Sequence, residues 1–95
     1  MENVIDISKF VEVTTEENVL TQIVNNVKAR RKDLKLSQKE LAERSGVSYA
    51  SIRRFENNGE ISFTSLLKIA DALQSLNEFT TLFSKKIITD LKDYK

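Results

Sequence analysis

Apolar residues recur three and four positions apart through most of the chain, and this spacing is typical of amphipathic α-helices. It predicts five helices: residues 15–33, 38–45 and 49–57, a fourth capped by Ser62 or Thr64, and a fifth that begins near Ser75. The apolar positions of the first, fourth and fifth helices are Val19, Leu20, Ile23, Val24, Val27, Phe63, Leu66, Leu67, Ile69, Ala70, Leu73, Leu76, Phe79, Leu82 and Phe83. The pattern predicts an all-α fold, a compact bundle of about five helices over residues 14–83.

The two ends of the chain follow other patterns. In residues 1–13, apolar and polar positions alternate at Ile5 and Ile7 and again at Val11 and Val13, which favours a short β-strand. A lone strand needs a partner, such as the same segment of another subunit. We therefore expect an extended N-terminal arm, either such a strand or a loosely ordered segment. Residues 84–95 form a tail, with Ile87, Ile88 and Leu91 on one side, that extends the fifth helix or forms a further short one.

Helix caps divide residues 36–56 into two short helices joined by a tight turn. Ser37 and Glu40 have the spacing of a capping box, and Thr14 and Glu17 have the same spacing before the first helix. Gly46 is suited to the positive φ that ends a helix, and Ser48 is placed to cap the next helix. Ile52 and Phe55 anchor the inner face of that second helix. This is a helix-turn-helix, the arrangement that places a helix in the major groove of DNA.

The charge of the chain is concentrated on this motif. The net charge is only +1, but residues 28–54 carry nine basic and three acidic side chains, and residues 1–27 carry one basic and five acidic ones. A basic cluster releases counterions from DNA and so supplies most non-specific affinity. Taken alone, this basic cluster is also consistent with an ordinary solvent-exposed helix face. Because it coincides with the helix-turn-helix motif, DNA binding is the favoured interpretation.

Composition argues against several other classes of protein. The chain contains no cysteine, no histidine and only two glycines, which removes the commonest metal ligands, the commonest general base and any glycine-rich phosphate loop. We expect no enzyme, no metal site and no cofactor. There is no apolar run of membrane-spanning length and no signal peptide at the start. The expected location is the cytoplasm, at the nucleoid, with no membrane partner. A protein-binding helical module is the rival interpretation, because bundles of this size are common adaptors.

The motif resembles the Cro/repressor (XRE-type) helix-turn-helix family over about residues 23–73. The resemblance is carried by Leu36, Ser37, Gln38, Leu41, Ala42, Gly46, Val47, Ser48, Ile52 and Glu56, followed by residues 66–73. It implies a lambda-repressor-like domain of four to five helices that binds double-stranded, pseudo-palindromic operators as a homodimer. The function implied is a transcriptional regulator, most simply a repressor.

The resemblance also implies roles for particular residues. Gln38 matches a glutamine that holds a DNA phosphate and buttresses the recognition helix. Tyr49, Ala50 and Ser51 occupy, after Ser48, the first turn of that helix, which meets base edges, although many relatives have glutamine there. Arg31 and Glu56 match a partly buried ion pair between the first and third helices.

Arginine provides the strongest candidate for base recognition. Arg54 aligns with a base-contacting position, and a guanidinium can bind O6 and N7 of guanine together. Arg53 is expected to reach a phosphate or solvent. Lys35, Lys39, Asn57 and Asn58 are further candidates for phosphate contacts. A surface role without DNA contact remains the alternative for Gln38 and for both arginines.

Two expectations concern partner proteins. The apolar residues beyond Leu73 exceed what the fourth helix needs, so Phe79, Leu82, Phe83, Ile87 and Ile88 form a candidate dimer interface, unless they complete the core of the monomer. The connection at residues 57–62 is one residue shorter than the commonest loop of the family and lacks its proline. This variant resembles antitoxins of the HipB kind. An antitoxin that binds both its promoter and a partner toxin is therefore the alternative function.

Overall fold

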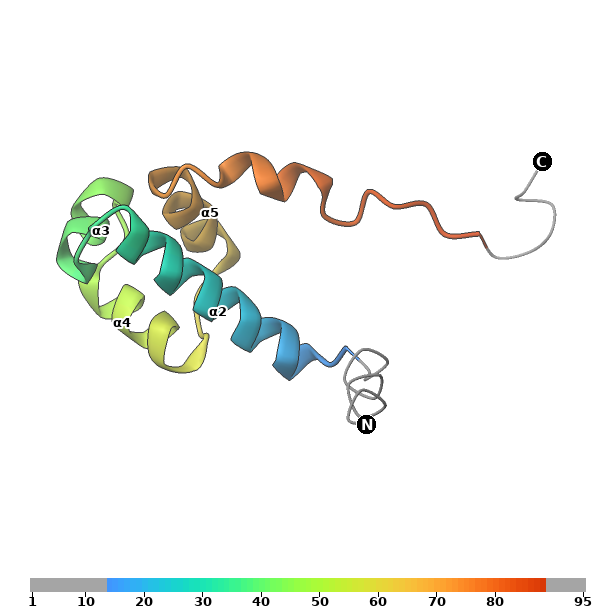
Figure 1. Ribbon diagram of the computed structural model, residues 1–95, viewed down its shortest axis with the longest axis horizontal. Helices are drawn as coiled ribbons and strands as arrows, with labels where there is room; N and C mark the ends of the chain where they lie inside the picture. The colour runs from blue at the N-terminus through green and yellow to red at the C-terminus, as the bar shows by residue number, and fades with distance from the viewer. Residues whose placement is uncertain (1–13, 89–95) are drawn as a thin grey trace, which may run out of the picture.

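The computed structural model describes residues 14–88, and this part of the chain contains five helices and no strand (Figure 1). Numbered as in Figure 1, they are α2 (Glu16–Asp33), α3 (Gln38–Ser45), α4 (Tyr49–Asn58), α5 (Phe63–Ala72) and the 3-10 helix η1 (Leu76–Thr81). The predicted all-α fold is confirmed. The N-terminal arm, residues 1–13, and the end of the tail, residues 89–95 with Leu91, lie outside the described residues.

The helix ends of the central motif are as predicted. Ser37 accepts a hydrogen bond from the backbone N–H of Glu40, whose side chain accepts one from the N–H of Ser37, so the capping box is complete. Gly46 ends α3 with φ +78°. Ser48 accepts from the N–H of Ser51 at the start of α4. These local interactions fix where α3 ends and where α4 begins, before any distant contact is needed.

One sequence-based prediction at a helix end is wrong. The cap of α2 is Thr15 and not Thr14, since the Thr15 hydroxyl accepts from the N–H of Asn18 at 3.0 Å. This start places two acidic side chains, Glu16 and Glu17, in the first turn, where the helix dipole favours them. The fifth helix begins directly after Ser75, as predicted, but it is a 3-10 helix and Ser75 makes no capping hydrogen bond.

The tail does not extend that helix within the described residues. Residues 84–88 are not helical and continue away from the bundle (Figure 1). A helix over residues 84–88 would have no other described element to pack against, and tertiary packing supplies most of the stability of a helix in a protein. The 3-10 form of η1 agrees with its length of six residues, because 3-10 helices occur mostly as short segments.

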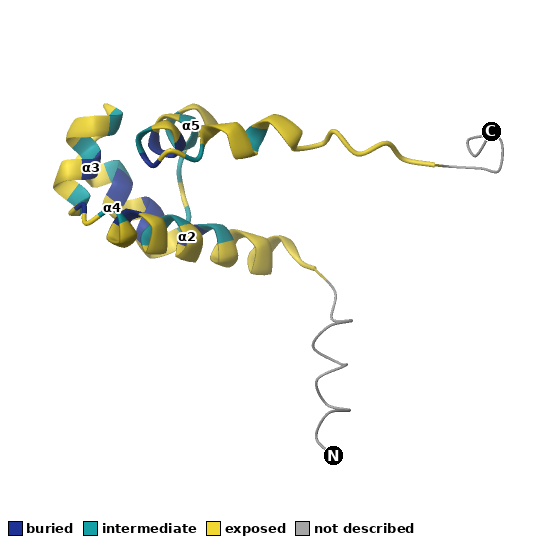
Figure 2. Cartoon of the chain, turned by 45° about the horizontal axis from the view of Figure 1, so that its top comes forward, coloured by how far each residue is buried: buried dark blue, intermediate teal, exposed yellow. Residues whose placement is uncertain are grey.

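The core lies where α3, α4 and α5 meet. Its buried members are Leu36, Leu41, Val47, Ile52, Ile69 and Leu73, with Phe55, Val24 and Ala70 also buried. Figure 2 shows the first turns of α2 largely exposed and the buried positions gathered among the other helices. The long helix α2 therefore packs through its C-terminal half, and the bundle presents α3 and α4 together at one end of the molecule (Figure 1).

Candidate nucleic-acid interface

Helix α4 divides cleanly into an inner and an outer face. Ile52 and Phe55 are 0% and 1% exposed and fasten the helix to the core. Three to four residues per turn then place the side chains between them on the opposite face. The outward residues are Tyr49, Ala50, Arg53, Arg54, Asn57 and Asn58, all exposed. An anchored helix with a polar, cationic outer face has the form of a recognition helix.

A buried ion pair ties α4 to α2. The guanidinium of Arg31 binds the carboxylate of Glu56 through two hydrogen bonds, Nε to Oε2 at 2.9 Å and Nη2 to Oε1 at 3.0 Å. The two side chains are only 10% and 3% exposed. Arg31 Nη1 also donates to the carbonyl of Leu36 at 2.8 Å, and Gln38 Nε2 donates to Glu56 Oε1 at 2.9 Å. The network therefore joins α2, the start of α3 and the end of α4.

The charge state of Glu56 follows from these partners. Burial alone raises the pKa of Glu56, but the hydrogen bonds from Arg31 and Gln38 and the charges of Arg31 and Lys28 outweigh it. The pKa is held below its ordinary value of 4.5, so the carboxylate is ionised at neutral pH. The resemblance implies that Gln38 holds a DNA phosphate. In the structure its side chain is half-buried, and one of its amide N–H groups donates to the carboxylate of Glu56.

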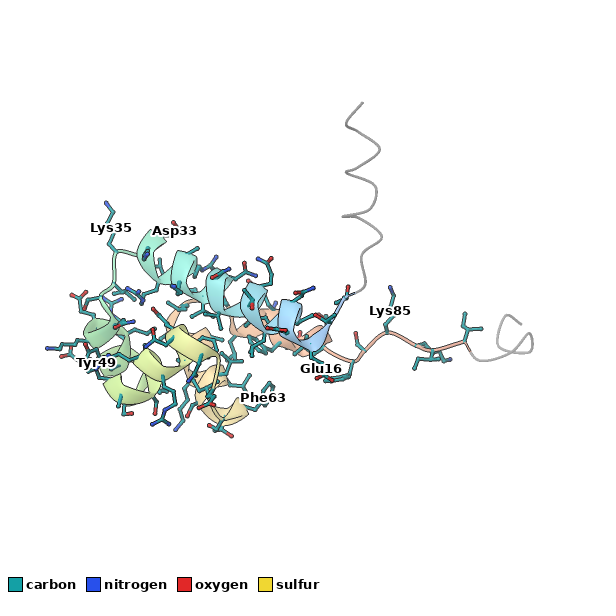
Figure 3. The ribbon with its side chains drawn as sticks, turned by 90° about the horizontal axis from the view of Figure 1, so that it is seen from below. Glu16, Asp33, Lys35, Tyr49, Phe63 and Lys85 are labelled. Atoms are coloured by element: carbon teal, nitrogen blue, oxygen red, sulfur yellow. The ribbon has the colours of Figure 1, made fainter. Side chains whose placement is uncertain are left out.

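Tyr49 gathers two cations on the exposed surface. Lys39 Nζ, from α3, lies 5.5 Å from the centre of the Tyr49 ring, and Arg53 Cζ, from α4, lies 5.6 Å from it. Cations at this distance are attracted by the electrons of the ring. The contact of Lys39 with Tyr49 links the outer faces of α3 and α4. It was not predicted from the sequence, where Tyr49 was considered only as a contact to a base or a phosphate. Figure 3 shows Tyr49 and Lys35 toward the same end of the molecule.

The remaining candidates lie around this surface. Arg54, Lys35, Ala50 and Asn57 are exposed. Ser51 is half-buried, and the Ser48 hydroxyl donates to it at 2.9 Å while capping α4. Asn58 is exposed, and its side-chain oxygen accepts from the N–H of Glu60. Ser48, Ser51 and Asn58 therefore have local structural partners of their own.

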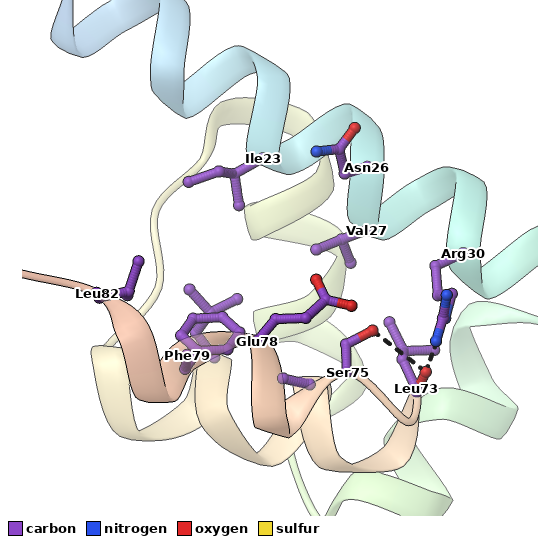
Figure 4. A pocket seen from close by; sticks show the side chains of 11 residues that line it. Ile23, Asn26, Val27, Arg30, Leu73, Ser75, Glu78, Phe79 and Leu82 are labelled. Atoms are coloured by element: carbon purple, nitrogen blue, oxygen red, sulfur yellow. Dashed lines mark hydrogen bonds between the residues drawn. The ribbon is translucent and has the colours of Figure 1, made fainter. Parts of the chain in front are cut away.

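Not every residue of the basic segment faces outward. Arg30 donates from Nε to the carbonyl of Leu73 at 2.9 Å and from Nη2 to that of Gln74 at 3.1 Å, and so binds the C-terminal end of α5 (Figure 4). With Arg31 paired to Glu56, two of the nine cations of residues 28–54 serve the fold. Sequence analysis missed the role of Arg30, because its partners are carbonyls more than forty residues away in the chain and no residue type marks them.

The candidate dimer residues lie on the other side of the molecule. Phe79 is half-buried and packs edge-on against Phe63, with ring centres 6.1 Å apart. Leu82, Phe83, Ile87 and Ile88 are exposed, Phe83 fully. They do not complete the core of this chain in its described part.

Residues 14–88 contain neither a metal-binding cluster nor a helix that could span a membrane. That part of the chain contains no group of three or more acidic residues placed to hold a metal ion. Its helices include none that is both long and apolar enough to cross a membrane.

Comparison with known proteins identifies the motif. Residues 27–79, more than half of the chain, match the family described as helix-turn-helix. No curated protein and no solved structure matches the chain. The matched segment contains the ion pair, the recognition helix and α5, and the family is a non-enzymatic one that binds DNA. The chain belongs to the helix-turn-helix family of the XRE/Cro type.

Proposed function

We propose that this protein is a transcriptional repressor that binds an inverted-repeat operator as a homodimer. The observation that carries the proposal is the exposed face of α4, with Arg53 and Arg54 outward while Ile52 and Phe55 fix the helix to the core. A single helix of this length reads only part of a helical turn of DNA, and two-fold assembly is how such motifs gain affinity and specificity.

Different residues of the proposed DNA-binding surface contribute to affinity and to sequence specificity. Lys35, Lys39 and Arg53 supply phosphate contacts, which position the protein without reading sequence. Arg54 reads guanine in the major groove, and Ala50 leaves room for a thymine methyl group. Gln38, held against Glu56 at the start of α3, lies where a helix N-terminus adds backbone donors for a phosphate.

Selection from a random pool of duplex DNA tests the proposal. We expect the purified protein to enrich an inverted repeat, and its affinity for that sequence to fall steeply as salt is raised. Absence of enrichment, with no salt-dependent binding, would show that the motif serves protein contacts instead. In a transcription assay, the operator placed over a promoter should reduce transcript yield when the protein is added.

Variants of Arg54 separate base reading from charge. Arg54→Ala should weaken operator binding by about 1–3 kcal/mol, roughly 5- to 150-fold, and relax the preference at one base pair. Arg54→Lys keeps the charge and so the salt dependence, but loses the two-pronged contact to guanine. Lys68→Ala, on the exposed side of α5, is the control and should leave sequence preference unchanged.

The alternative function is an antitoxin that binds both its promoter and a toxin. Its support is the short connection at residues 57–62 alone. Recovery of an operator by the protein on its own favours the repressor, whereas operator binding that requires a second protein from the same operon favours the antitoxin.

A further inference from the structure

An apolar groove lies between α2, α5 and η1. It has a volume of about 350 Å³ and is lined by Ile23 and Val27 of α2, Leu66 of α5, and Phe79 and Leu82 at the 3-10 helix (Figure 4). Its lining includes no residue of α3 or α4. The groove is therefore separate from the surface proposed to meet DNA.

The segment that follows the groove carries apolar side chains that residues 14–88 of its own chain do not cover. Leu82 lies at the edge of the groove, and from there residues 83–88 run away from the bundle (Figure 1). Phe83 is 101% exposed and Ile87 77% exposed, and Ile88 is also exposed. Exposure of these apolar side chains to water is unfavourable, because burial of each one lowers the free energy of the system.

We propose that this groove receives residues 83–88 of a second copy of the chain, in a twofold exchange of tails. The tail leaves its own groove at Leu82 and points outward, so the nearest matching surface is the groove of a partner. Two charged side chains line the groove: Arg30, which donates to the carbonyls of Leu73 and Gln74, and Glu78. The charge of Glu78 is opposite to that of Lys85 and Lys86, which lie between Phe83 and Ile87 on the tail.

The area of such an exchange suits a stable dimer. In a twofold dimer each contact occurs twice. Burial of one phenylalanine covers about 150–250 Å². Two tails with three apolar side chains each, together with the groove walls, therefore approach the 1,200 Å² or so of a specific interface.

The exchange deepens the homodimer of the proposed function and rests on it. It leaves both recognition helices free, because the tail and α4 lie at opposite ends of the molecule; in Figure 3, Lys85 and Tyr49 are far apart. Both α4 helices stay exposed in the exchanged dimer, so each copy can bind one half-site of an inverted repeat.

Cross-linking between two differently tagged chains tests the exchange directly, because the natural chain contains no cysteine. We would co-express a Ser84→Cys chain with an Asn26→Cys chain, whose substitution lies in the groove. After oxidation we expect a disulfide-linked heterodimer in at least about tenfold excess over a control pairing of Ser84→Cys with Glu43→Cys, on the exposed side of α3. Equal yields would overturn the proposal. So would a chain carrying both substitutions that forms only an internal disulfide, which would show the tail folding back on its own groove.

Substitution of the tail provides the second test. Phe83→Asp with Ile87→Asp should convert the dimer to a monomer in analytical ultracentrifugation, while Val19→Asp, an exposed apolar position outside the groove, should not. Both should keep the helical circular dichroism of the natural chain. A tail variant that remains dimeric would refute the exchange.

DNA binding separates the failure of this inference from the failure of the proposed function. The tail variant should bind a single half-site as the natural protein does and lose the extra affinity for the complete inverted repeat. If the natural protein dimerises through the tail but binds neither DNA, the exchange stands and the proposed function fails. If the tail variant binds the inverted repeat with unchanged affinity, the exchange fails and DNA recognition stands.

Discussion

The ion pair between Arg31 and Glu56 allows the sharpest prediction about stability. Each side chain is almost completely buried, and its hydrogen-bond partners are the other member of the pair and two neutral groups, Gln38 and the carbonyl of Leu36. Replacing one member leaves the charge of the other buried, with little solvent around it and without its oppositely charged partner. Arg31→Met or Glu56→Leu alone should therefore lower the free energy of unfolding by about 3–5 kcal/mol. A chain of this size has about 5–15 kcal/mol in total.

Replacing both members should cost less than replacing either one. With Arg31→Met and Glu56→Leu together, neither of the paired charges remains, and two apolar side chains occupy the space between α2 and α4. The chief loss is the donor to the carbonyl of Leu36, which costs about 1–3 kcal/mol if that group stays unpaired. The double variant should thus show a favourable coupling of at least about 3 kcal/mol between the two positions.

Urea unfolding followed by circular dichroism measures these differences. In thermal unfolding, 3 kcal/mol corresponds to a fall in Tm of about 12 °C or more for a domain of this length. Arg44→Met, an exposed arginine on α3, is the control and should change stability by no more than about 0.5 kcal/mol. Two results would contradict this prediction: a loss of unfolding free energy below about 1 kcal/mol in each single variant, or a loss in the double variant equal to the sum of the two. Either result would show that Arg31 and Glu56 do not stabilise each other as a buried ion pair.

Three further predictions follow from particular contacts. The natural protein should lose stability as pH falls below about 4.5, because the pKa of Glu56 is lowered in the folded state and the stabilisation vanishes once the carboxylate is protonated; Glu56→Gln should remove that part of the pH dependence in unfolding measurements. Gly59→Ala should destabilise more than Gly46→Ala: both need a positive φ, worth about 1–2 kcal/mol, but a Cβ at Gly59 would lie 2.7 Å from the Leu20 side chain while one at Gly46 meets nothing within 4 Å. Adding Leu20→Ala should recover only the excess, and no recovery would contradict the contact. Tyr49→Leu should lower the free energy of unfolding by about 1–2 kcal/mol and weaken DNA binding, whereas Tyr49→Phe keeps the ring and should do neither; equal losses would show that the hydroxyl matters and not the two cations.

Much of the fold was predictable from sequence because it is decided within a few residues. The capping box of Ser37 and Glu40, the positive φ of Gly46 and the cap by Ser48 each involve partners at most three or four positions apart. Such contacts form whenever the local backbone does, so residue types at fixed spacing are enough to locate them. The same holds for the helical spacing of Ile52 and Phe55, which places the outer face of α4.

The tertiary structure decided what depends on how the helices pack. Only the packed bundle brings Arg30 to the carbonyl of Leu73, Gly59 against Leu20, and Lys39 to the ring of Tyr49. These partners lie on different helices, and their approach depends on crossing angles that no local pattern encodes.

The fate of the apolar C-terminal residues was decided in the same way. Sequence alone left Phe83 and Ile87 as either the last part of the core or a surface for a partner, because both uses need the same residue types. The α3, α4 and α5 helices already enclose the core with Leu41, Ile52 and Ile69 fully buried, so these two side chains remain outside it. The sequence by itself thus determined the helices and the outer face of α4 that we propose to meet DNA, and packing determined which cations remain on that surface and which apolar surface remains uncovered.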